Sequence, residues 1–339
     1  MATPLFSEET FKKAFGLTKK FERDFVDDIV VALGRLDRAL LPPPASHPMA
    51  TLIAEGPRAV DRLLALVERG SAKESADAAD ALAQVLAGHT TPTSTVERLR
   101  AALQTKAGEA EFEALLAKTL AISGDQQFLT EQLLRLADDD PGVVATAARL
   151  LGFGRATFAV PALMGLVSPE RFFESRWVIW ALGEIGDARA LPALEIALAN
   201  AFRVVDCLIA IGKIGRLTSI PHLTPHITGG FSEQKDAAVR ALAMILDNNR
   251  DGGHAMGAVR EQLGGLLERD LADPLAPIST SIRFHMLLCL ARLGVHLDAA
   301  RVKKYLGVSA DARESPFARV APAPTRKPVA ERAVRPKVP

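Results

Sequence analysis

Aromatic residues are scarce in this 339-residue chain. They make up 5% of it, with one tyrosine and two tryptophans, whereas hydrophobic residues together reach 48%. The core must therefore be built from aliphatic side chains, mostly alanine and leucine, which lose little side-chain freedom in a helix. Alternating runs of β-branched residues, which are typical of strands, are also lacking. This composition predicts an all-α protein.

Cysteine is scarce as well. Cys207 and Cys289 both stand in apolar helical stretches, which indicates buried free thiols and excludes a disulfide framework. The first ten residues do not combine a charged segment with a following apolar one, and no run approaches the roughly 18 uncharged apolar residues of a membrane-spanning helix. We therefore expect a soluble, cytoplasmic protein without a transmembrane segment.

No charge of one sign dominates the chain, whose formal net charge is +1. Residues 308–339 hold seven basic and three acidic side chains, a net charge of +4, which leaves −3 for the rest. Sequence-independent nucleic-acid binding needs many phosphate contacts, so this mildly acidic body is unsuited to it. The segment 308–339 is rich in alanine and proline without periodicity, which predicts disorder.

Motifs of enzymes are missing too. The chain contains neither the nucleophile motif G-x-S-x-G nor the phosphate-binding motif G-x-x-x-x-G-K-[ST]. Residues 247–252 match the first half of a calcium loop, but Ala258 takes the place of its bidentate glutamate. His222 and His226 have helical spacing without a third metal ligand nearby. We expect a non-enzymatic protein that needs no cofactor and no metal ion.

What the chain does contain is an internal repeat. Three segments align: LLGFGRATFAVPAL (150–163), ALGEIGDARALPAL (181–194) and AIGKIGRLTSIPHL (210–223). Their first shared glycines are 31 and 29 residues apart, and so are their prolines. Residues 121–134 form a weaker copy without the proline, and the copy at 236–249 ends on an aspartate where the others have glycine. Such a period is typical of stacked helical hairpins.

The repeat unit has a readable physical pattern. An apolar helix runs into Leu-Gly, where the glycine is expected to take the left-handed conformation that ends a helix. A short turn then leads to a proline in the first turn of the next helix, where its missing N–H costs nothing. The pattern resembles HEAT repeats of the short type found in phycobilin-lyase-like proteins, most clearly over residues 121–247. The resemblance implies an α-solenoid (α-α superhelix) of HEAT-like hairpins, which must stack to bury their apolar faces.

Other segments flank this array. Residues 7–41 carry an apolar stripe at helical spacing, which predicts an amphipathic helix that covers the open end of the solenoid or enters a partner's groove. The expected organisation is a capping helix with a proline-rich turn (1–44), degenerate helical repeats (45–120), HEAT-like repeats (121–250), C-terminal degenerate repeats (251–307) and a disordered basic tail (308–339).

The inner surface of the middle repeats is the candidate binding site. In HEAT-like proteins the second helix of each hairpin usually lines the concave side, so the resemblance implies that its outward positions face a partner. Tryptophan and arginine are the residues most enriched among interface hot spots. We therefore expect a protein-protein interaction scaffold or adaptor that binds another protein on this face, with Trp180 as the better interface candidate of the two tryptophans and with Trp180 and Arg176 exposed on one face. The expected partner-binding residues are Arg149, Arg176, Trp177, Trp180, Asp206 and Ile209.

Three alternatives remain open. One or both tryptophans could fill a gap in the core. The resemblance also reaches HEAT-like-repeat DNA glycosylases and bilin lyases, and Trp177, Trp180, Arg149 and Asp206 could mimic the concave site of the former. The basic tail could tether the chain to an anionic membrane, nucleic acid or acidic protein. The tail residues expected to contact such a partner are Arg326, Lys327, Arg332, Arg335 and Lys337.

Overall fold

Helices account for all regular structure in the described part of the chain. The computed structural model describes residues 49–105, 110–229, 232–249, 257, 263–269, 271 and 280–293, and none of these residues belongs to a strand. The all-α prediction is therefore confirmed. The expected capping helix and the basic tail lie outside the described residues, as does most of 251–307.

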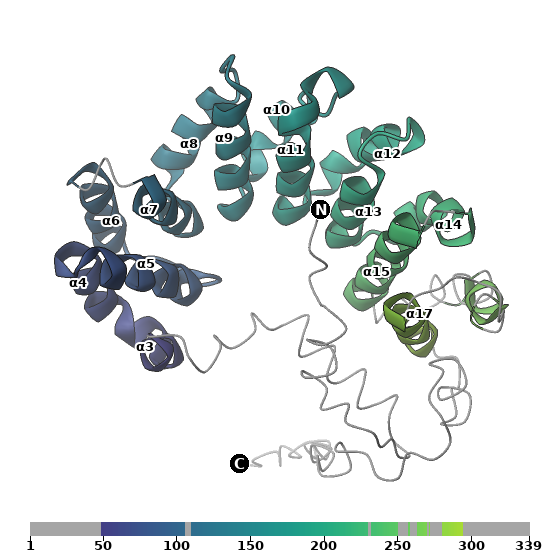
Figure 1. The fold of residues 1–339 in the computed structure, drawn as a ribbon, viewed down its shortest axis with the longest axis horizontal. Coiled ribbons are helices and arrows are strands. Elements are labelled where there is room, and N and C mark those ends of the chain that lie inside the picture. Colours follow the sequence, from purple (N-terminus) through teal and green to yellow (C-terminus); the bar gives the residue numbers. More distant parts are fainter. Residues whose placement is uncertain are drawn as a thin grey trace, which may run out of the picture.

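The helices form a row of antiparallel hairpins that curves into an arch (Figure 1). A short helix, α3 (Ala50–Glu55), precedes the first hairpin. Six hairpins lie within the described residues, and their outer helices are α4 (Val60–Arg69), α6 (Thr93–Thr105), α8 (Gln126–Arg135), α10 (Val160–Met164), α12 (Leu191–Ala199) and α14 (Ile220–Gly229). Their inner partners are α5 (Ala72–Leu86), α7 (Ala110–Ile122), α9 (Pro141–Phe153), α11 (Phe172–Ile185), α13 (Val204–Ile214) and α15 (Ser232–Asn248). The row of inner helices ends with α17 (Thr280–Arg292), which packs on α15.

Local sequence explains where many helices begin. Asp140 caps α9 by accepting a hydrogen bond from the backbone N–H of Gly142, and Pro141 follows as the first helical residue. The three repeat prolines each stand second in α10, α12 and α14, directly after a single 3₁₀ turn. The expected role of proline at a helix start is confirmed.

The two glycines of the repeat motif have different roles. Gly152, Gly183 and Gly212 lie inside α9, α11 and α13, and none of them has a positive φ. The second glycine ends the helix in two repeats, with φ of +73° at Gly186 and +75° at Gly215. The expectation that the glycine of Leu-Gly is the left-handed cap was therefore wrong.

The first glycine instead allows neighbouring inner helices to approach closely. A Cβ atom on Gly183 would lie 2.9 Å from the Cα of Ala210, and one on Gly212 would lie 2.6 Å from the Cα of Ala241. Atoms cannot pack at these distances without moving the backbone. The Leu-Gly glycine is thus a contact position between consecutive repeats.

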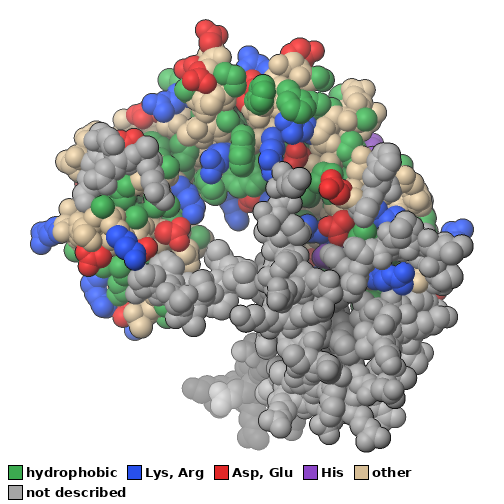
Figure 2. Space-filling model, viewed as in Figure 1, with side chains coloured by type: hydrophobic (Ala, Val, Ile, Leu, Met, Phe, Trp, Pro, Cys, Tyr) green, Lys and Arg blue, Asp and Glu red, His purple; other side chains and the backbone are tan. Residues whose placement is uncertain are grey.

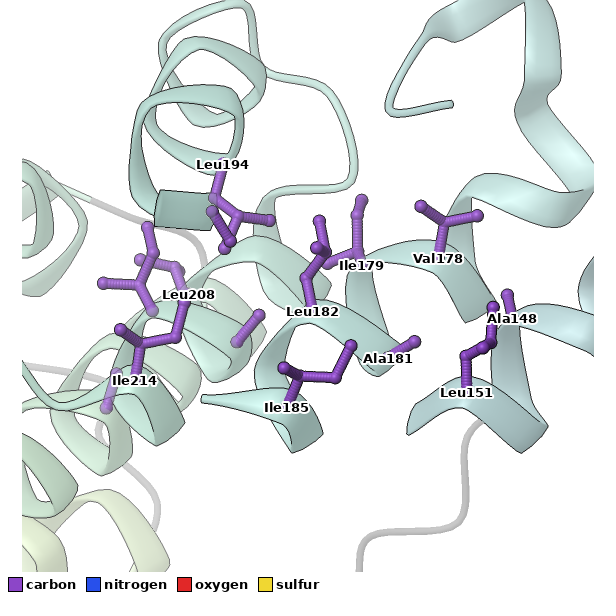
Figure 3. Close-up of a cluster of buried hydrophobic side chains, with 14 of the residues drawn as sticks. Ala148, Leu151, Val178, Ile179, Ala181, Leu182, Ile185, Leu194, Leu208 and Ile214 are labelled. Atoms are coloured by element: carbon purple, nitrogen blue, oxygen red, sulfur yellow. The ribbon is translucent and has the colours of Figure 1, made fainter. Parts of the chain in front are cut away.

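Aliphatic side chains fill the space between the inner and outer rows. Figure 3 shows one part of this core, where Ile179 and Leu182 of α11 lie between Leu151 of α9 and Leu208 of α13, with Leu194 of α12 above them. All five side chains are buried. Each hairpin is therefore stabilised by its neighbours, as stacked repeats require. Among the described residues, no helix is both long enough and apolar enough to cross a bilayer.

Candidate functional site

Aromatic side chains gather on the inner face of the arch where α9 and α11 adjoin. We call Phe153, Trp177 and Trp180 the aromatic strip. The rings of Trp177 and Trp180 meet edge to face at 6.5 Å between centroids, and those of Phe153 and Trp180 do so at 5.0 Å. All three side chains are half-buried. In the space-filling view, hydrophobic side chains on the inner side of the arch are flanked by Lys and Arg (Figure 2).

Trp177 is flanked by two guanidinium groups. The Cζ of Arg149, from α9, lies 4.7 Å from the ring centroid, and the Cζ of Arg176 lies 5.5 Å from it. Both arginines are exposed. A cation over an indole face is attracted by the ring quadrupole, by about 0.5–1 kcal/mol at an exposed site. Three of the residues expected from the sequence therefore come together around one ring.

Trp180 has more contact with the core. It packs against the buried cluster, and a Cβ atom on Gly152 would lie 2.8 Å from its Cζ3. The close approach of α9 and α11 thus leaves room for this indole only because position 152 is glycine. Trp180 fills a gap between two helices on one side and contributes to the surface on the other.

Two lysines lie beside the aromatic strip, and each is paired with a carboxylate. Lys118 of α7 lies 5.7 Å from the Phe153 ring centroid, with its Nζ 3.3 Å from Asp80 of α5. Lys213 of α13 lies 5.8 Å from the Trp180 ring centroid and forms an ion pair with Glu184. The charge of both lysines is therefore balanced within the protein.

The two remaining expected site residues lie on α13. Burial raises the pKa of the Asp206 carboxyl, although the positive charges of Arg176 and Arg203 act in the opposite direction. The nearest atoms of Asp206 and Arg203 are 4.0 Å apart. Ile209 is half-buried and packs against the core cluster. Asp206 is thus an acidic neighbour of Arg176 and Arg203, while Ile209 belongs partly to the core.

An exposed aromatic pair marks the beginning of α11. Phe172 and Phe173 are 54% and 78% exposed, and their ring centroids are 6.0 Å apart. Arg203 stacks on Phe172 with its Cζ 4.0 Å from the ring centroid, and it donates a hydrogen bond to the Phe172 carbonyl. These contacts hold Arg203 at a φ of +48°, a conformation that non-glycine residues rarely adopt.

The sequence prediction missed Phe153, Phe172 and Phe173, along with both lysines. A signal for Phe172 and Phe173 was present, because they stand a few residues before the two tryptophans in a chain that is 5% aromatic, whereas Phe153 lies one repeat earlier in the sequence. The lysines could not be found in this way, since their partners come from other helices.

Metal ligands do not assemble in the described part of the chain, which contains no group of three or more His, Cys, Asp or Glu side chains able to hold an ion. His222 lies beside Glu195, with 3.6 Å between Nε2 and Oε2. Burial raises the pKa of both cysteine thiols to about 12, which leaves them protonated and unreactive at neutral pH. The five tail residues expected to bind an anionic partner lie outside the described residues.

Comparison with known proteins gives a family for the middle of the chain. The HEAT repeat family matches residues 127–206. None of the curated proteins compared with the chain matches it.

Several solved structures align with this chain at low TM-scores and low sequence identity. The complex of CpcE and CpcF of phycocyanin lyase from Nostoc sp. PCC7120 aligns with a TM-score of 0.39 and 19% identity, over 65% of this chain and 96% of that one. An engineered protein aligns with a TM-score of 0.38 and 18% identity, over 90% of this chain and 95% of that one. Human deoxyhypusine hydroxylase in complex with glycerol aligns with a TM-score of 0.30 and 17% identity, over 80% of this chain and 98% of that one.

The spacing of the glycines and prolines, the paired inner and outer helices and the family match at residues 127–206 all agree. Residues 127–206 belong to the HEAT repeat family, and the described residues form an α-solenoid of HEAT-like helical hairpins.

Proposed function

We propose that this protein is a scaffold that binds another protein on the concave face of its solenoid, with the aromatic strip at the centre of the contact. The observation that carries the proposal is the group at Trp177, where two exposed guanidinium groups have their Cζ atoms within 5.5 Å of the centroid of a half-buried indole. Large aromatic and arginine side chains dominate the energetics of protein interfaces.

The surroundings of the strip also suit an interface. An aromatic centre is bordered by charged side chains of α5, α7 and α13, which resembles the apolar core and polar rim of known protein contacts. The curved row of inner helices offers a long surface, the feature that repeat proteins use for binding.

A DNA-processing enzyme is less well supported by this surface. Asp80, Glu184 and Asp206 all lie on inner helices next to the cations. These carboxylates would repel a phosphate backbone, and the neighbouring lysines are already paired.

A capture experiment tests the proposal. The full chain, immobilised through an affinity tag, is exposed to a native lysate, and the retained proteins are identified by mass spectrometry. Trp177→Ala is expected to remove the specific partners, with a loss of binding of about 2 kcal/mol or more for a central hot spot.

Ile196→Ala is the matched control, because Ile196 is 63% exposed on the outer helix α12. Circular dichroism spectra should show that both variants are folded. Equal capture by the wild type and Trp177→Ala would contradict the proposed site.

A further inference from the structure

We infer that the segment bound at Trp177 is an acidic peptide stretch of the partner protein, whose carboxylates are held by Arg149 and Arg176. This inference rests on the proposed function, since it names the chemistry of the partner that the concave face would bind.

The first step concerns the pairing of the cations on the inner face. Lys118, Lys213 and Arg203 each lie within 4.0 Å of a carboxylate from this chain. Arg149 and Arg176 form no ion pair within the described part of the chain, although both are exposed beside Trp177. The positive charge of Arg149 is therefore available to a ligand, and that of Arg176 is offset only in part by the nearby Asp206.

The second step concerns geometry. A guanidinium attracted to an indole face has no N–H group committed to a carboxylate of its own, so it can donate two parallel hydrogen bonds to a carboxylate of a ligand. Attraction to a half-buried ring also limits the motion of the arginine, so less conformational entropy is lost when the carboxylate binds. Two such groups on one ring fit two acidic side chains that flank an apolar one.

The third step distinguishes a peptide from a nucleic acid. In the described part of the chain Arg149 and Arg176 form no ion pair, although Asp206 lies close enough for the charge of Arg176 to oppose the effect of burial on its pKa. A continuous phosphate backbone would meet the carboxylates of Asp206 and Glu184 as well as the arginines. An acidic peptide can place its few charges at the arginines and its apolar side chains on the rings of the strip.

The chain's own residues 308–339 do not fit this surface. That segment has a net charge of +4, so the two arginines would repel it. The complementary ligand is a negatively charged segment from another protein.

Tryptophan fluorescence gives a direct test, because Trp177 and Trp180 are the only tryptophans in the chain. The full chain is titrated with a synthetic peptide of glutamates around one central phenylalanine, and separately with the matching lysine peptide and a single-stranded oligonucleotide. We expect the glutamate peptide to change the emission in a saturable manner, with affinity falling as salt is raised.

Arginine variants identify the binding groups. Arg149→Gln and Arg176→Gln are each expected to weaken binding of the glutamate peptide about tenfold, as loss of a charge-assisted hydrogen-bonded pair would do. Arg135→Gln, an exposed arginine at the end of the outer helix α8, is the matched control and should leave the affinity unchanged.

Several outcomes would overturn the inference: no change with the glutamate peptide, equal binding of the lysine peptide, tighter binding of the oligonucleotide, or unchanged affinity in both glutamine variants. The scaffold proposal is tested by a different experiment, the lysate capture. If lysate capture depends on Trp177 but the glutamate peptide does not bind, the concave site stands and only the acidic chemistry is wrong.

Discussion

Asp125 combines two stabilising contacts in one side chain. It caps α8 by accepting hydrogen bonds from the backbone N–H groups of Gln127 and Phe128. It also accepts two hydrogen bonds from the guanidinium of Arg100 on α6, while its own side chain is 4% exposed. Burial alone would raise the pKa of Asp125, but the hydrogen bonds from Arg100 and the backbone outweigh it, so the pKa lies below its usual value.

We predict that Asp125→Ala lowers the free energy of unfolding at neutral pH by about 2–4 kcal/mol, from the lost cap and the lost charged hydrogen bonds. Because the pKa of Asp125 is lowered on folding, its contribution is complete above the unfolded-state pKa, about 3.9, and disappears as pH falls through the folded-state value. Urea denaturation followed by circular dichroism should therefore show a smaller difference between wild type and variant in acid.

Asp125→Asn provides a comparison, since the amide oxygen can still cap α8 but carries no charge for Arg100. At neutral pH, Asp125→Asn should lower the free energy of unfolding less than Asp125→Ala does. A difference between wild type and variants that stays constant down to acid pH would show that the ion pair contributes nothing.

At the scale of the helices, glycine sets how closely consecutive inner helices pack. Alanine favours a helix over glycine by about 1 kcal/mol, so propensity alone predicts that replacing Gly212 stabilises the protein. The structure predicts the reverse, because the new Cβ would lie 2.6 Å from the Cα of Ala241 on α15. Backbone atoms at this contact cannot move aside without separating the two helices.

We predict that Gly212→Ala lowers the free energy of unfolding by about 1–3 kcal/mol. Gly265→Ala is the control, because Gly265 is an exposed helical glycine with no heavy atom within 4 Å of an added Cβ. The control should be neutral or stabilise by up to about 1 kcal/mol. Thermal and urea denaturation of both variants would decide the point, and equal stabilisation by both would refute a close-packing role for Gly212.

At the scale of the whole molecule, the main contacts between helices in the described part of the chain join neighbouring repeats. The last described inter-repeat contact contains an ion pair between Arg292 of α17 and Asp247 of α15, whose side chains are 4% and 13% exposed. Arg292 also donates a hydrogen bond to the backbone carbonyl of Ala243. Asp247 is the residue that replaces the closing glycine of the repeat, so the departure from the motif coincides with a specific contact at this end of the array.

We predict that Asp247→Ala destabilises the α15–α17 contact by about 3–5 kcal/mol, since it leaves the buried guanidinium of Arg292 without this carboxylate. In a linear array the loss is local, so helices near α17 should unfold first. Urea unfolding followed by circular dichroism should begin earlier than in the wild type, while tryptophan fluorescence, which reports on α11, should shift less.

Glu233→Ala, an exposed acidic residue in the first turn of α15, serves as the control and should cost under about 1 kcal/mol. Coincident shifts of both signals in Asp247→Ala would mean that the array unfolds as one cooperative unit.

The sequence by itself determined the helical class, the period of the repeat and the beginnings of its helices. These features depend on short-range physics: the rotamer freedom of alanine and leucine, proline at a helix start and aspartate at a cap. Each of these features depends on residues close together in the sequence, so each can be predicted without knowledge of the fold.

Only the tertiary structure decided what the same residues contact across repeats. It separated the packing glycine at 183 from the capping glycine at 186, and it distinguished Trp180, which packs against the core, from Trp177, which lies between two arginines. It also paired Lys213 with Glu184 and left Arg149 without an acidic partner in the described part of the chain. The physical reason is distance along the chain. Apart from the helix cap and the adjacent pair Arg176 and Trp177, these contacts join neighbouring helices about one repeat apart, and no local sequence pattern shows which side chains will face each other.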